Sequence, residues 1–262
     1  MKLSSFVAFL SVYLMFFPTN VFANNVEEKY IYEKENDVQL RTSIAFEKKL
    51  SQRFSLAFNE ELRMKDNVSH IDRLCTDLNA SFKIASWLKV NAAYTLISVL
   101  HKNKKSSVNQ WNFRHRATAG FALSYQVIDN LTLSLKERVQ MTHYAHQHFD
   151  NREKRTPQWG MKSKIQVEYK CRQCPLVPFS YVELCNTLNA PKLTEGNYID
   201  KVRSGLGTTL RLDKKNSITF LYRFDYVLEK KVKVKKSTGH LKTLTHQKEY
   251  NNVFGIAYKF KF

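Results

Sequence analysis

Glycine, proline and long apolar runs are all scarce in this chain. The 262 residues include only 7 Gly and 5 Pro, which argues against a glycine-rich nucleotide fold and against a low-complexity array. After the N-terminal leader, no stretch approaches the roughly 18 uncharged apolar residues of a membrane-spanning helix. Aromatic residues are abundant instead, with 18 Phe, 13 Tyr and 3 Trp, so intrinsic disorder is excluded.

The N-terminus has the pattern of a secretory signal peptide. Met1 and Lys2 provide a positive start, residues 3–17 are uncharged and apolar, and Pro18 breaks this run before the small residue Ala23. That order is typical of a cleaved leader, which we assign to residues 1–23. No cysteine follows the cleavage position, so we do not expect lipid attachment there. Export also argues against nucleic acid as a partner, although the net charge is +19.

The chain has four cysteines, and an exported protein meets an oxidising environment. Cys171 and Cys174 have a spacing that also occurs in redox turns and in half-sites for zinc. This pair lies between two strand-like runs, whereas a redox pair normally starts a helix. We therefore expect a structural disulfide or inert thiols, with no metal or other cofactor.

Apolar and polar residues alternate with a period of two over nearly all of residues 38–262. In the first run, Val38, Leu40 and Ile44 alternate with Gln39 and Arg41. Eleven such runs of about ten to fifteen residues follow one another, which is the length that tilted membrane-spanning strands need. A soluble β-sandwich is the alternative, but its strands are usually shorter.

Short and long connections alternate between the runs. The short ones lie near residues 48–52, 85–87, 128–130, 171–175 and 213–216, and the long polar ones near 101–110, 146–157, 186–197 and 231–246. Short turns on one side and long loops on the other are typical of outer-membrane barrels. We therefore predict an all-β fold, a transmembrane antiparallel up-and-down β-barrel of about 12 strands (10–12) with periplasmic turns and extracellular loops. Because bacterial barrels usually have an even strand number, the charged segment 24–37 is the candidate for a first strand.

The last run places aromatic residues on one face and ends on Phe262. A terminal aromatic that closes an amphipathic strand resembles the signal read by the outer-membrane barrel assembly machinery. We therefore expect that machinery as a partner, with the C-terminus in the periplasm.

Several short motifs lie within these strand-like runs. They are FNEELR at 58–63, IDR at 71–73 followed by TDL at 76–78, WLKV at 87–90, RHR at 114–116 and LSLKER at 133–138. With them, residues 38–262 resemble the Bacteroidota-type outer-membrane barrel family known as domain of unknown function 2490. The resemblance implies the barrel fold and no activity, because none is established for the family.

The polar face of the strands would line the lumen, and it is rich in arginine. The predicted lumen-lining residues are Arg41, Arg53, Glu61, Arg63, Arg73, Asp77, Arg114, Arg116, Lys136, Arg138, Arg203, Arg223 and Asp225. Buried guanidinium groups need partners, so some of them should pair with the acids on this face. Two interpretations remain open: a lumen plugged by its own ion pairs, or a narrow, positively lined pore that favours anions.

Two further hypotheses concern histidines and serine. His143 and Ser163 both face outward on neighbouring strands, as the reactive groups of a membrane-embedded lipid hydrolase would. His146 and His148 would share a face and could hold a transition metal, but no nearby acid or cysteine completes a site. We therefore expect a non-catalytic barrel, either a narrow pore or a structural or binding protein, with the lipid hydrolase as the alternative.

Two charged features and the location of the protein complete the prediction. Residues 229–236 include five lysines, which form a solvated segment or meet the phosphates of lipopolysaccharide. Glu60 and Glu137 fall on the lipid-facing side, so either they lie near an interface or a bulge shifts the register there. We expect a monomer in the bacterial outer membrane, surrounded by lipids and lipopolysaccharide.

Overall fold

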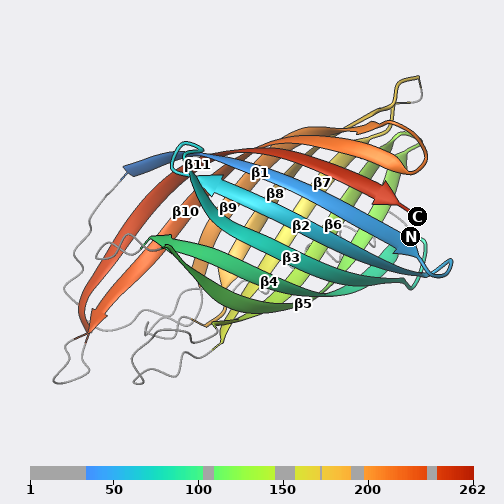
Figure 1. Cartoon of the computed structure of the whole chain (residues 1–262). Helices are drawn as coiled ribbons and strands as arrows, with labels where there is room; N and C mark the ends of the chain where they lie inside the picture. Colours follow the sequence, from blue (N-terminus) through green and yellow to red (C-terminus); the bar gives the residue numbers. More distant parts are fainter. Residues whose placement is uncertain (1–33, 103–108, 145–156, 172, 190–197, 235–240) are drawn as a thin grey trace.

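The computed structural model describes residues 34–102, 109–144, 157–171, 173–189, 198–234 and 241–262. Within them, eleven β-strands form one closed barrel (Figure 1). The strands are β1 (Lys34–Lys49), β2 (Phe54–Lys65), β3 (His70–Lys83), β4 (Leu88–Lys102), β5 (Asn109–Ile128), β6 (Leu131–Tyr144), β7 (Gln158–Tyr169), β8 (Leu176–Thr187), β9 (Tyr198–Arg211), β10 (Asn216–Val234) and β11 (Leu241–Lys261). The predicted all-β barrel is confirmed. In the described part of the chain, no helix has the length and hydropathy needed to cross a bilayer.

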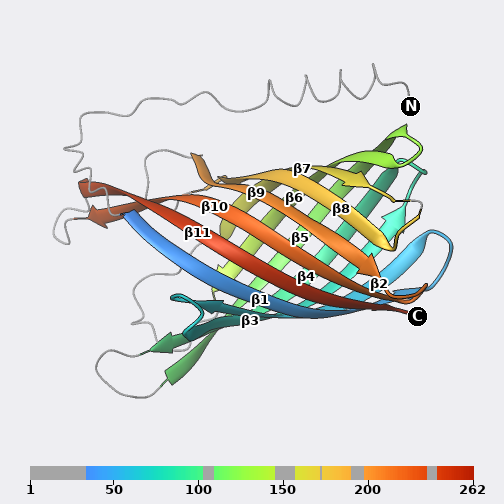
Figure 2. The same ribbon diagram turned by 90° about the horizontal axis from the view of Figure 1, so that it is seen from above.

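The barrel closes with eleven strands, within the predicted range and one fewer than twelve. Each consecutive pair is antiparallel, so an odd number of strands leaves the first and last running in the same direction. β1 pairs with β11 in parallel from Lys34 opposite Lys248 to Glu47 opposite Lys261, and Figure 2 shows the two strands side by side. The candidate for a twelfth strand, and the leader at 1–23, lie outside the described residues except for residues 34–37, which belong to β1.

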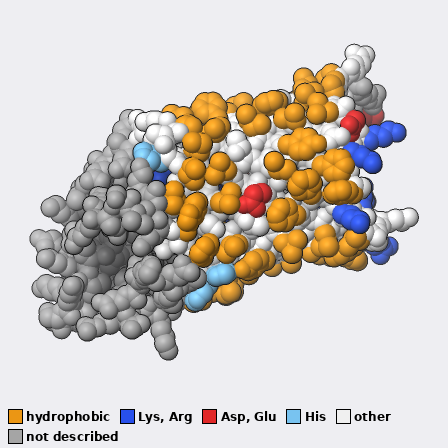
Figure 3. Space-filling model, in the orientation of Figure 1, with side chains coloured by type: hydrophobic (Ala, Val, Ile, Leu, Met, Phe, Trp, Pro, Cys, Tyr) orange, Lys and Arg blue, Asp and Glu red, His pale blue; other side chains and the backbone are white. Residues whose placement is uncertain are grey.

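The period of two in the sequence gives the barrel an apolar outside and a polar inside. Every strand exposes large hydrophobic side chains outward, for example Ile44 of β1, Leu78 of β3 and Leu206 of β9. In Figure 3 these side chains cover the middle of the barrel, and Lys and Arg gather at the end with the short turns. Inward positions hold polar and charged residues, together with a few buried apolar ones such as Ile97 and Val253.

Short turns join the strands at the end of the barrel where the C-terminus lies (Figure 1). In the β9–β10 turn, the Asn216 side-chain amide and the N–H groups of Lys215 and Asn216 donate hydrogen bonds to the Asp213 carboxylate. These bonds favour the ionised form and lower the pKa of Asp213. This turn is therefore held by its own side chains and needs no support from the lumen.

The turn between β2 and β3 lies at the opposite end and is tied to the start of β1. Asp66, Asn67 and Val68 have φ values of 55°, 56° and 63°, a region that a β-branched residue such as Val68 rarely adopts. The Val68 N–H donates to the Val38 carbonyl at 3.1 Å, and the Asn67 N–H donates to Asp37 Oδ1 at 2.8 Å. These bonds hold the turn at the mouth of the lumen.

The two outward glutamates keep the register that the sequence indicates. The pairing of β2 with β3 and of β6 with β7 shows no shift at Glu60 or Glu137, so a bulge is not the explanation. Thr76 Oγ1 donates to Glu60 Oε1 at 3.1 Å, and Ser163 Oγ donates to Glu137 Oε2 at 2.8 Å. A hydroxyl group on the neighbouring strand therefore faces each carboxylate.

Candidate functional site: a basic cavity in the barrel

The barrel contains a cavity of about 1020 Å³. Its lining includes the start of β1, the end of β2 and the β2–β3 turn, so it lies toward the end of the barrel opposite the short turns. Eleven Lys and Arg side chains and eight Asp and Glu side chains line it. The cavity therefore carries an excess of positive charge.

Most of the lumen residues expected from the sequence meet in this cavity. Nine of the thirteen line it: Arg41, Glu61, Arg63, Arg73, Arg116, Arg138, Arg203, Arg223 and Asp225. Three others occupy inward register positions elsewhere: Asp77 accepts a hydrogen bond from Thr95, Arg114 lies opposite Ile97, and Lys136 lies opposite Lys164.

Arg53 is the exception among the thirteen residues. It lies in the bend at residues 50–53, just before strand β2 begins at Phe54, and it is exposed. It is not among the residues that line the cavity. That Arg53 lines the lumen therefore stays a prediction.

One wall of the cavity is a chain of alternating charges centred on Glu183 of β8. Glu183 pairs with Arg138 of β6 and, at 2.5 Å, with Arg203 of β9. Arg203 Nε lies 3.5 Å from Asp225 Oδ2, and Arg223 Nε lies 2.6 Å from Asp225 Oδ1. These groups are largely buried, so each carboxylate offsets the charge of two guanidinium groups in a place with little solvent.

Sequence reasoning missed Glu183, although it is central to this wall. The run at residues 176–187 has an ambiguous apolar pattern, and the structure shows it as a regular strand whose register with β9 shifts between Cys185 and Asn186. Glu183 is opposite Lys164 of β7 and Arg203 of β9. Only the cross-strand register reveals this position as a meeting point of charges.

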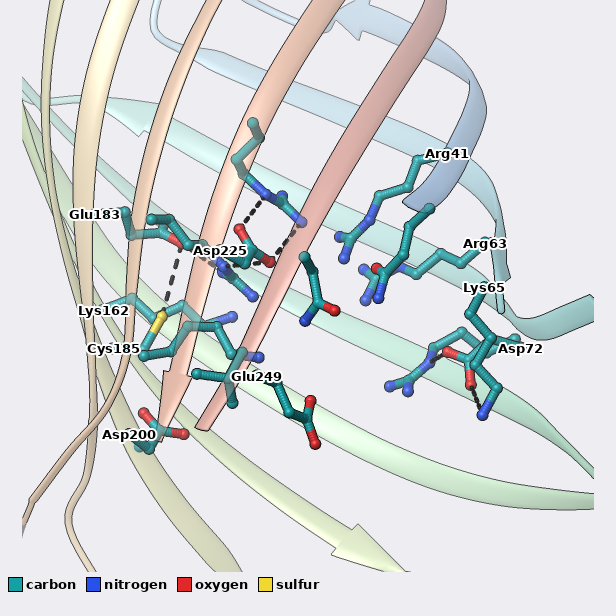
Figure 4. Close-up of a pocket in the computed structure, with 18 of the residues that line it drawn as sticks. Arg41, Arg63, Lys65, Asp72, Lys162, Glu183, Cys185, Asp200, Asp225 and Glu249 are labelled. Carbon is teal, nitrogen blue, oxygen red and sulfur yellow. Dashed lines mark hydrogen bonds and ion pairs between the residues drawn. The ribbon is translucent and has the colours of Figure 1, made fainter. Parts of the chain in front are cut away.

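The facing wall is built by β1, β2 and β3. Arg63 pairs with Glu61 on the same strand, and Asp72 pairs with Arg73 and lies 3.5 Å from Lys65 Nζ. Figure 4 shows Arg41 and Arg63 extending into the cavity from this side, opposite Asp225 and Glu183. Arginines of both walls thus approach the same space.

Besides Lys65, three further lysines line the cavity and were not among the predicted lumen residues. Lys164 Nζ lies 3.8 Å above the ring of Tyr181, a cation–π contact. For Lys162 and Lys201 the described residues provide no ion pair. These lysines therefore contribute most of the uncompensated positive charge, together with Arg41.

The cysteines fall into two groups. Cys171 and Cys174 form a disulfide in the β7–β8 turn, with Cα atoms 5.5 Å apart, outside the cavity. Cys185 lines the cavity with its Sγ 3.8 Å from Glu183 Oε1, and Cys75 is buried beside Ile97 and Val99. Within the described ranges, no three His, Cys, Asp or Glu side chains are grouped to hold a metal ion, and His146 and His148 lie outside those ranges.

The structure does not bring His143 and Ser163 together. Ser163 lies opposite Glu137 in the β6–β7 pairing, and His143 lies opposite His115 in the β5–β6 pairing. Six residues of β6 separate Glu137 from His143, which is roughly 20 Å along a strand. A serine nucleophile and its base must be within hydrogen-bond reach of each other, so these two residues do not form the proposed hydrolase pair.

The chain is similar to a solved structure and to a protein family. A solved structure of the NanC porin, in a rhombohedral crystal form, aligns with 86% of this chain and 99% of its own chain at 10% identity and a TM-score of 0.46. No curated protein sequence matches the chain. The family model for proteins of unknown function DUF2490 matches residues 38–234, which confirms the resemblance noted from the sequence motifs. The chain therefore belongs to the DUF2490 family.

Proposed function

We propose that this barrel spans the bacterial outer membrane as a narrow, non-catalytic pore that favours anions. The excess of positive charge around the 1020 Å³ cavity is the observation that supports this function best. Rings of Arg and Lys select for anions in membrane pores. A structural or binding barrel whose lumen is closed by ion pairs is the outcome against which the pore must be tested.

The outward face supports a membrane location. Large hydrophobic side chains are exposed around the barrel, including Leu206 at 60% and Leu78 at 55% of their full accessibility. An apolar band of this kind is unfavourable in water and matches the lipid-facing surface of an outer-membrane barrel. With lipids around this band, the short turns would face the periplasm and the residues 229–236 would meet lipopolysaccharide phosphates.

The C-terminal strand supports assembly by the barrel machinery of that membrane. Phe262 follows β11 at the turn end, and its ring lies 4.7 Å from Phe260 and 6.5 Å from Phe46, centroid to centroid. Its N–H donates to the Glu47 carbonyl at 2.9 Å. The terminal aromatic is thus part of an outward-facing aromatic group at the seam where β1 meets β11. We propose that one chain forms one barrel.

Single-channel conductance in a planar bilayer with a salt gradient tests the pore. The refolded mature protein is expected to give reproducible conductance steps with an anion-selective reversal potential. A double variant, Lys162→Gln with Lys201→Gln, should shift that potential toward zero, because it removes two cavity charges for which the described residues provide no ion pair.

The matched control is Lys214→Gln with Lys215→Gln, which removes the same charge from the exposed β9–β10 turn. This control should leave the reversal potential close to that of the wild type. A silent bilayer, with heat-modifiable gel migration proving that the barrel has folded, would instead indicate a lumen closed by the Glu183 and Glu61 ion pairs.

A further inference from the structure

Three arginines lie directly opposite one another on three adjacent strands. Arg41 of β1 is the register partner of Arg63 of β2, and Arg63 is the register partner of Arg73 of β3. We call these residues the arginine row. Neighbouring strands are about 4.8 Å apart, and like charges directly opposite each other destabilise a sheet. The row therefore opposes folding unless anionic groups compensate it.

The protein supplies carboxylates for only two members of the row. Glu61 pairs with Arg63, and Asp72 pairs with Arg73. For Arg41 the described residues offer neither an ion pair nor a hydrogen bond, and its Nε atom is buried. Among the described residues, this half-buried guanidinium group is thus left without an ion-pair contact of its own.

The surroundings of Arg41 add positive charge. Arg63, Arg203 and Arg223 line the same cavity and repel the Arg41 guanidinium group, and Glu61, which pairs with Arg63, attracts it. The register partner of Arg41 on β11 is Gly255, whose own partner on β10 is Leu221, two residues before Arg223. Figure 4 shows the Arg41 and Arg63 guanidinium groups directed into the cavity on the side that faces Asp225.

We propose that Arg41, with Arg63 and Arg223 beside it, binds one carboxylate or phosphate group of a small anionic solute inside the lumen. The planar guanidinium fork offers paired N–H donors that match the two oxygens of such a group. Chloride has no matching pair of acceptors. The solute's access to this site rests on the proposed function. The site identifies small anions with a carboxylate or phosphate group as the class of solute that the pore favours.

Thermal unfolding of the refolded mature protein in an uncharged detergent tests the site. An anion that binds only the folded state raises the unfolding midpoint, and above its dissociation constant the rise continues with the logarithm of its concentration. Inorganic phosphate and acetate, each compared with chloride at equal ionic strength, are expected to raise the wild-type midpoint with this logarithmic dependence. In R41Q, the apparent affinity for phosphate should fall about tenfold or more, since hydrogen bonds to a charged group are lost.

Two comparisons decide whether Arg41 binds the anion or only shapes the wall. R53Q removes an arginine from the exposed β1–β2 turn and should keep the full phosphate response. Without phosphate, R41Q should be no less stable than the wild type, because it removes repulsion with the other arginines and breaks no ion pair. An unchanged phosphate response in R41Q, an absent response in the wild type, or failure of R41Q to fold would each overturn the proposal.

The site and the pore can fail separately. A silent bilayer together with an Arg41-dependent phosphate response would reject the pore and keep a binding barrel. Anion-selective conductance together with equal phosphate responses in R41Q and the wild type would keep the pore and reject the site.

Discussion

Glu183 shows how one buried side chain can organise a wall of the lumen. Its carboxylate is 6% exposed and touches the guanidinium groups of Arg138 and Arg203. Each of these arginines comes from a different strand, so Glu183 ties β6, β8 and β9 together across the inner face. A carboxylate shared in this way stabilises both cations only while it remains charged.

Replacing Glu183→Gln should therefore destabilise the barrel by about 3 kcal/mol, the usual effect of removing one partner from a buried ion pair. The free energy of unfolding, measured by urea titration in detergent, is the readout. Glu47→Gln is the matched control, because its partner Lys259 is 41% exposed and exposed pairs contribute less than about 1 kcal/mol. Equal losses in the two variants would contradict the central role of Glu183.

At the scale of elements, β8 and β9 pack closely because two glycines leave room for two rings. Tyr181 lies opposite Gly205 and Phe179 opposite Gly207, and the two rings are stacked with centroids 6.5 Å apart. A Cβ atom added at Gly207 would lie 2.4 Å from the Phe220 carbonyl oxygen and 2.7 Å from Phe179 Cζ. The first of these atoms belongs to the backbone and cannot move aside without distorting β10.

Gly207→Ala is therefore expected to destabilise the barrel by about 2–3 kcal/mol, the upper range for overpacking. The fraction of folded, heat-modifiable protein and the urea midpoint should both fall. Gly255→Ala is the comparison: its added Cβ would lie 3.3 Å from Leu221 Cβ, and the nearest backbone atom, the Leu221 carbonyl oxygen, would be 3.7 Å away, an ordinary van der Waals contact. If Gly255→Ala lost as much stability as Gly207→Ala, the close approach at β9 would not be the cause.

At the scale of the whole molecule, the seam between β1 and β11 decides the strand number. Fourteen register pairs join the two strands, from Lys34 to Glu47 of β1. The sheet is thus closed by the described strands themselves, and a further strand has no free edge to join. The sequence predicts about 12 strands (10–12), and the closed topology sets the number at eleven within that range.

Deleting residues 24–33 should therefore leave the barrel intact. We expect the shortened mature protein to refold with an unchanged far-UV circular dichroism spectrum and the same heat-modifiable gel shift, because every described strand keeps both neighbours. Loss of the folded band in this variant, but not in the full mature chain, would show that the sheet needs a part of this segment.

The polar face was largely predictable, and the contacts on it were not. Arg203, Arg223 and Asp225 were assigned to the lumen from alternation alone, and all three line the cavity. Lys162 and Lys201 follow the same alternation and also line the cavity, but alternation does not show which lumen charges find an ion-pair partner. Alternation also gives no sharp end to a strand: Arg53 continues the pattern, but it lies in the bend before β2.

The sequence by itself determined the class of fold and the side of the sheet on which each residue of a strand lies. Those properties follow from the local period of two, since successive side chains of a strand point to opposite faces. The tertiary structure alone decided which charges meet: the arginine row, the bridge at Glu183 and the parallel closure of β1 with β11. These depend on the register between strands that are distant in sequence, and a local pattern contains no information about that register.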